Sequence, residues 1–67
     1  MAGPGELFWV VVFDRGRVSA PRGFAVREEA LVFATLQMAA EWVEVVAAES
    51  AEEAVARAIG RGRAPGR

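Results

Sequence analysis

The residues from Leu7 to Phe13 form an unbroken apolar run of seven, LFWVVVF. A strand with one wet face alternates apolar and polar side chains, because successive side chains point to opposite faces of a sheet. This run does not alternate, so both of its faces are expected to be buried. Its length and its content of Val and aromatic residues are typical of a buried strand. The run therefore raises the question of what covers its second face in a chain of 67 residues.

The size of the chain limits the possible answers. A single domain of 67 residues buries only about 60% of the surface that its unfolded form exposes, so its core is marginal. Small domains often add disulfides, a metal or a partner chain. Cys and His are absent, which excludes disulfides and leaves only carboxylates as side-chain ligands for zinc. With an apolar content of 54%, the sequence favours association with another chain.

Charge and targeting signals exclude some classes of partner. The net charge of −1 gives no overall field that attracts nucleic acid or a membrane. The apolar run is too short to span a bilayer, and the preceding MAGPGE has no basic side chain of the kind that opens a signal peptide. The absence of Cys fits a cytoplasmic location. All eight basic residues are Arg, a bias that is typical of GC-rich genomes, including those of thermophiles.

The first half of the chain predicts a strand, a turn and a helix. After the apolar run, Asp14 and Gly16 favour a tight turn, because Gly accepts positive φ and Asp can bond to the local backbone. A short return strand is expected at 17–20, and Pro21 and Gly23 then break regular structure. A helix without a clear N-cap is expected at 27–40. Its apolar residues point in several directions, which predicts burial by more than one neighbour.

The second half predicts another strand and a well-defined helix. The strand is expected at 41–48. Ser50 and Glu53 have the spacing of a capping box, in which side chains bond to free N–H groups at a helix start. Glu53 and Arg57 are spaced for a favourable i,i+4 ion pair, and Gly60 is suited to end the helix.

The predicted fold is α+β. It is a small two-layer domain with the order β–(short β)–α–β–α, in which two or three strands carry two helices packed on one face. A right-handed parallel crossover is expected to join the strand at 7–13 to the strand at 41–48. Residues 1–5 are expected to be a flexible lead-in, 6–60 the domain, and 61–67 a flexible Arg/Gly tail.

Two helices on one face would leave the other face of the sheet open. The set expected beneath the helices is Phe8, Val10, Val12, Val43, Val45 and Ala47. The set expected on the open face, and hence in an interface, is Leu7, Trp9, Val11, Phe13, Trp42 and Val46. At roughly 25 cal/mol per Å², leaving such a face wet would forfeit several kcal/mol. A symmetric homodimer is the expected solution. The alternative is that the lead-in, the loop at 21–24 and the tail complete a monomeric core.

Catalytic residues are scarce. His, Cys, Lys and Tyr are absent, which removes the usual general bases and covalent nucleophiles. The hydroxyls are those of Ser19, Thr35 and Ser50, and Asp14 is the only Asp. No phosphate-binding motif is present, because GRGR follows a predicted helix instead of opening one. We therefore expect no enzymatic activity, no metal site and no cofactor.

The expected function is a non-enzymatic protein–protein association module, a homodimeric accessory or regulatory subunit. The alternative is a nucleic-acid-binding regulatory factor, because the basic residues cluster near the predicted turn and in the tail. The candidate contacts of that alternative are Arg15, Arg17, Arg22, Arg27, Arg61 and Arg63. The competing explanation is that these arginines keep an apolar protein soluble or pair with the glutamates of a partner copy. A third hypothesis is a flat ligand stacked between Trp9 and Trp42 at a dimer seam.

Overall fold

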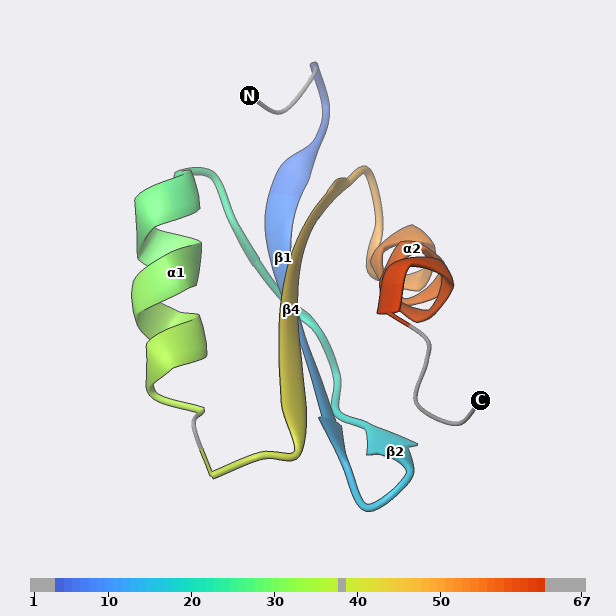
Figure 1. The fold of residues 1–67 in the computed structure, drawn as a ribbon. Coiled ribbons are helices and arrows are strands. Elements are labelled where there is room, and N and C mark those ends of the chain that lie inside the picture. The colour runs from blue at the N-terminus through green and yellow to red at the C-terminus, as the bar shows by residue number, and fades with distance from the viewer. Residues whose placement is uncertain (1–3, 38, 63–67) are drawn as a thin grey trace.

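The computed structural model of the chain describes residues 4–37 and 39–62, with side chains as far as residue 60. The elements are β1 (Leu7–Asp14), β2 (Arg17–Val18), β3 (Arg22–Phe24), α1 (Arg27–Thr35), β4 (Trp42–Ala48) and α2 (Ala51–Gly62) (Figure 1). The α+β class is confirmed, with one additional strand, β3. Neither of the two helices in the described part of the chain is long and apolar enough to cross a membrane.

β1 is the central strand of an antiparallel sheet. β4 pairs with it over its whole apolar run, from Leu7 opposite Ala48 to Phe13 opposite Trp42. β2 and β3 also pair with β1 in antiparallel fashion, and they share its other edge because β4 already occupies the first. The expected parallel crossover to β4 is therefore wrong. β3 carries the chain back along β1 before α1 begins, and this reversal makes β4 antiparallel.

The β2–β3 edge of the sheet is short and interrupted. Arg15 and Gly16 have φ values of 56° and 76°, as a two-residue hairpin turn requires, so the predicted tight turn is confirmed. Val18 then lies opposite Phe13, but Arg22 lies opposite Val10, so three residues of the return strand oppose two of β1. This extra residue is a bulge.

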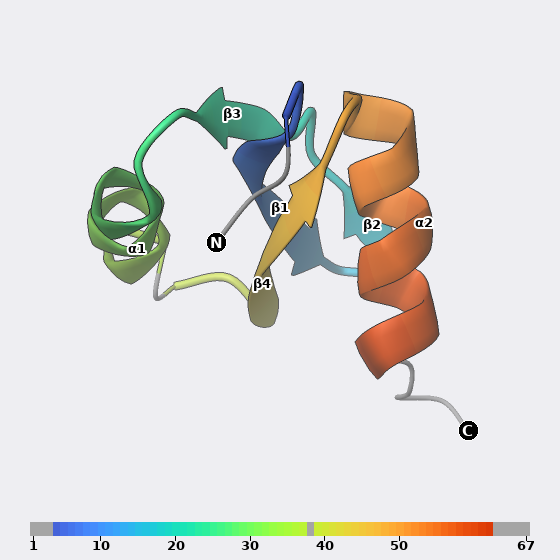
Figure 2. The same cartoon turned by 90° about the horizontal axis from the view of Figure 1, so that it is seen from above.

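The two helices lie on opposite faces of the sheet, so the molecule has three layers (Figures 1 and 2). Ala54 and Ala58 of α2 belong to a cluster with Val11, on one face. Phe33 of α1 packs on Phe24 with ring centroids 5.5 Å apart, and Phe24 pairs with a residue of the other face. The two-layer arrangement with both helices on one face is thus not observed. The physical reason lies in β1, because an apolar run without alternation is satisfied only when both of its faces are covered.

The core consists of a few Val side chains beneath small helical residues. Val10 and Val11 point to opposite faces of β1 and are the largest fully buried side chains. Ala30 of α1 and Ala54 and Ala58 of α2 are also fully buried. Small residues let each helix approach the sheet closely, so one helix covers each face of a narrow sheet.

The observed helix ends agree only in part with those predicted from the sequence. The Ser50 hydroxyl accepts the Glu53 N–H at 3.1 Å, and the Glu53 carboxylate accepts the Glu49 N–H at 3.0 Å, so the predicted capping is confirmed. α2 continues past Gly60 to Gly62, so Gly60 does not end the helix. α1 begins at Arg27 without a side-chain cap, but it ends at Thr35, before the predicted end at residue 40.

Candidate association surface

The residues predicted to form an interface share one face of the sheet, but this face is not open. Trp9 lies opposite Val46, and Phe13 lies opposite Trp42, which places their side chains together. α2 packs on this face, where Val11 has no exposed surface and Val46 is 5% exposed. Trp9 and Phe13 are partly buried against the same cluster. An interface formed by this set stays a prediction. The reason given for it, an open face of the sheet, does not hold, because α2 covers that face.

The two tryptophans occupy separate environments. The Trp9 indole Nε1 donates a hydrogen bond of 2.9 Å to the Ala48 carbonyl oxygen. The Trp42 ring instead stacks on Phe13, with centroids 4.9 Å apart and an interplanar angle of 23°. Each ring therefore has its own partner within the molecule, and the pair forms no common slot for a flat ligand.

The two most exposed large apolar side chains in the described part of the chain lie on or directly after α1. Val32 is 63% exposed and Leu36, which follows the helix, is 73% exposed. α1 was expected to be buried by more than one neighbour, but in the described part of the chain it packs only on the sheet. A shallow open hollow of about 340 Å³ lies beside it, lined by Phe24, Glu28, Glu29 and Val32.

The open edge of β4 is the second uncovered surface. β4 has no Gly, Pro, Lys or Arg, and Glu44 is its one charged residue. In the part of the chain that the structure describes, β4 pairs only with β1. Figure 1 looks onto this edge, with α1 on one side and α2 on the other. No local pattern in the sequence predicts this edge, because the edge depends on the order of the strands in the sheet.

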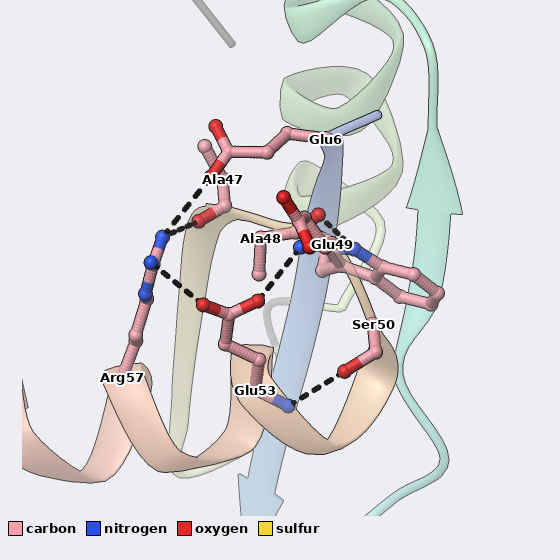
Figure 3. Close-up of polar contacts among 8 residues, drawn as sticks. Glu6, Ala47, Ala48, Glu49, Ser50, Glu53 and Arg57 are labelled. Carbon is pink, nitrogen blue, oxygen red and sulfur yellow. Dashed lines mark hydrogen bonds and ion pairs between the residues drawn. The ribbon is translucent and has the colours of Figure 1, made fainter. Parts of the chain in front are cut away.

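One side chain caps the end of the open edge (Figure 3). Arg57 Nη1 donates a hydrogen bond of 2.6 Å to the Ala47 carbonyl oxygen. The same guanidinium pairs with Glu53 at 2.7 Å, as the sequence predicts, and with Glu6 at 3.5 Å. This network fastens α2 to the end of the sheet and leaves the rest of the β4 edge uncapped.

The arginines predicted to contact nucleic acid do not form a single patch. Arg15 and Arg17 lie at the hairpin, beside an open hollow of about 580 Å³. Arg22 lies over the Phe24 and Phe33 rings, 5.6 and 5.3 Å from their centroids. Arg27 begins α1 at the opposite end of the sheet from the hairpin (Figure 1). Of the tail arginines, the Arg61 side chain and all of Arg63 lie outside the described residues.

The polar residues that could support chemistry are dispersed. The Thr35 hydroxyl donates to the Leu31 carbonyl oxygen, and the Ser50 hydroxyl caps α2. Among residues 4–37 and 39–62, no three carboxylates gather as a metal site would require.

Comparisons of the chain with protein-family models, with curated proteins and with solved structures find no match. The function is therefore inferred from the geometry of the molecule itself.

Proposed function

We propose that this chain is a small non-enzymatic association module, a homodimeric accessory or regulatory subunit, that self-associates through the open edge of β4. The observation that supports this proposal is the contrast between the two edges of the sheet. The β2–β3 edge is short, bulged and interrupted at Pro21. The β4 edge is a continuous strand of seven residues without any of these features.

Edge strands present unpaired N–H and C=O groups, and natural proteins usually protect them with short strands, bulges, Pro or Lys. An edge without such protection accepts a further strand, whose main-chain hydrogen bonds supply affinity. Each new hydrogen bond contributes about 0.5–1.5 kcal/mol net. Several such bonds are a large addition for a small domain, whose total stability is of the order of 5–15 kcal/mol.

The outer side of α1 supports the accessory or regulatory part of the proposal. Val32 lies on the exposed side of α1, whose other side covers the sheet, and Leu36 directly follows the helix. A dimer joined edge to edge through β4 leaves these residues exposed. Exposed apolar side chains that lie close together are typical of a surface that binds another protein. α1 is therefore the surface through which the dimer would contact the protein that it serves.

Nucleic-acid binding is the second candidate, and it depends on the hairpin. Arg15 and Arg17 lie on either side of Gly16 at an exposed tip. Contacts to phosphate weaken steeply as the salt concentration rises. A gel retardation assay at low salt tests this candidate. A shift that disappears with added salt and with Arg15→Ala and Arg17→Ala would support it, and no shift at low salt would exclude it.

One Val→Lys substitution at each edge tests the association proposal. Val43→Lys places a positive charge on β4, and Val18→Lys places the same charge on β2 as a matched control. Light scattering over a dilution series should show at least a tenfold weaker dimer for Val43→Lys and no change for Val18→Lys. Circular dichroism checks that both variants fold. An equal effect of the two substitutions would contradict the proposed surface.

A further inference from the structure

We infer that α1 and β3 together bind an amphipathic segment of the protein that this chain serves, with charges of opposite sign at its two ends. The segment carries an Arg or Lys at one end, large apolar side chains in the middle and an Asp or Glu at the other end. This inference rests on the proposed role of α1 as a binding surface, and it adds the chemistry of the partner.

Large exposed apolar side chains are concentrated around α1. Among the described residues, most of the large apolar side chains that are at least 38% exposed precede, belong to or directly follow this helix, namely Val26, Leu31, Val32 and Leu36. Leu36 donates its N–H to the Val32 carbonyl oxygen at 3.3 Å, so it lies one helical turn beyond Val32 on the same side. A concentration of this kind is typical of a surface that binds another protein.

The hollow beside α1 combines apolar surface with two acidic side chains. Phe24 of β3 and Val32 of α1 line it together with Glu28 and Glu29. In the part of the chain that the structure describes, neither of these carboxylates accepts a hydrogen bond or forms an ion pair. The helix dipole accounts for acids in the first turn of α1, but not for the apolar side chains exposed beside them. A Lys or Arg side chain fits such a hollow, because its aliphatic part packs on apolar surface while its charge stays at the rim.

Arg22 of β3 gives the same surface a charge of the opposite sign. Its guanidinium lies over the Phe24 and Phe33 rings, so two aromatic rings hold it in place. No carboxylate of the described residues forms an ion pair with it. Phe33 is one turn beyond Glu29 on α1, so the basic group is displaced along the helix from the acidic pair. A bound segment therefore meets negative charge at the start of α1 and positive charge about one turn later.

These charges determine which segment fits and in which direction it lies. Complementary charges across an interface select the partner and its orientation, and like charges placed together are costly. A basic side chain is therefore favoured beside Glu28 and Glu29 and disfavoured beside Arg22, where an acidic side chain pairs instead. Apolar side chains between the two ends cover Phe24 and Val32. A purely apolar or purely basic segment leaves one of the charges without a partner.

Selection from a random peptide library displayed on phage tests the inference, with the unmodified chain as the target. The peptides that bind should share large apolar residues with Arg or Lys on one side and Asp or Glu on the other. The Val32→Gln variant should lose this class of peptide, whereas Ile59→Gln, which changes an exposed apolar residue of α2, should retain it. Failure to recover the class, or its equal recovery with both variants, would overturn the inference.

Charge substitutions test the orientation of one selected peptide, with fluorescence anisotropy as the binding assay. Glu28→Gln/Glu29→Gln should weaken binding at least about tenfold, and a peptide whose basic residue is replaced by Gln should not register the change. Arg22→Gln should act in the same way on the acidic residue of the peptide. Glu49→Gln/Glu52→Gln removes the same charge near the start of α2 and is the matched control. Equal losses for the two double variants would show a response to net charge alone and would overturn the inference.

Light scattering separates this inference from the proposed self-association. Glu28→Gln/Glu29→Gln should leave the dissociation constant of the dimer unchanged, because a dimer joined through β4 leaves the exposed side of α1 uncovered. Circular dichroism checks that each variant folds. A chain that dimerises but selects no such peptide would overturn the inference and leave self-association standing. A chain that selects the peptide as a monomer would support the inference and contradict self-association.

Discussion

The indole Nε1 of Trp9 donates a hydrogen bond of 2.9 Å to the carbonyl oxygen of Ala48, 39 residues later in the chain. The bond joins the central strand β1 to the last residue of β4. Trp9 is partly buried against the cluster that α2 covers. A Trp side chain in such a place buries its ring and still needs a partner for its N–H, and Ala48 supplies that partner.

Trp9→Phe should therefore destabilise the fold by about 1–2 kcal/mol, because it removes this hydrogen bond and part of the buried ring. Trp42→Phe is the matched control, since Trp42 stacks on Phe13 and a Phe ring can retain much of that contact. Urea denaturation measures both free energies of unfolding. The assigned role of the Trp9 N–H would be contradicted by a larger loss for Trp42→Phe than for Trp9→Phe.

Ala58 is fully buried where α2 meets the sheet. Ala58→Leu should cost about 1–3 kcal/mol, because a larger side chain there forces the helix away from Val11 and Val46. Ala56→Leu makes the same change at an exposed position of α2 and should stay within about 0.5 kcal/mol. Thermal unfolding of the two variants compares them. Similar melting temperatures would show that α2 does not cover this face.

Ser50→Ala should cost about 1 kcal/mol, because the Glu53 N–H loses the hydroxyl that caps it. Ser19→Ala is the control, since its described hydrogen bond to Val12 uses the backbone N–H, which the substitution keeps. Chemical denaturation should separate the two variants clearly. A Ser50→Ala protein as stable as Ser19→Ala would mean that the cap contributes nothing.

Arg15 has a φ of 56°, a conformation that is unfavourable for most residues other than Gly, Asn and Asp. Arg15→Asn creates the Asn-Gly pair that this type of turn prefers and should stabilise the fold by about 0.5–1 kcal/mol. Arg17→Asn, one residue past the turn, should bring no such gain. Denaturation midpoints measure the difference. A destabilised Arg15→Asn protein would contradict this account of the hairpin.

The local elements could be predicted because their signals are local. The positive φ at Gly16 and the cap at Ser50 each depend on a few neighbouring residues. The sequence does not predict β3, because Pro21 and Gly23 are typical of a break in regular structure. In the fold, Gly23 lies in β3, where a Cβ atom would come within 3.0 Å of Leu7 Cδ1 and 3.2 Å of the Trp9 ring. A side chain at this position would crowd Leu7 and the Trp9 ring, and this crowding depends on residues far away in sequence.

The error at Gly23 explains the other differences. Without β3, the chain was expected to reach β4 in parallel orientation, with both helices on one face and the set around Trp9 uncovered. The apolar run of β1 correctly indicated burial of both faces. The run itself does not indicate that α2 is the element that packs on the second face. The uncovered surfaces are consequently α1 and the β4 edge, and neither follows from a periodicity of the sequence.

Sedimentation equilibrium of the unmodified chain over a wide dilution series tests the proposed self-association most directly. We predict a mass of twice the 7.2 kDa of one chain at high concentration, falling toward 7.2 kDa on dilution. A mass of 7.2 kDa at every concentration would contradict the proposal, because the β4 edge would then remain open without a second copy.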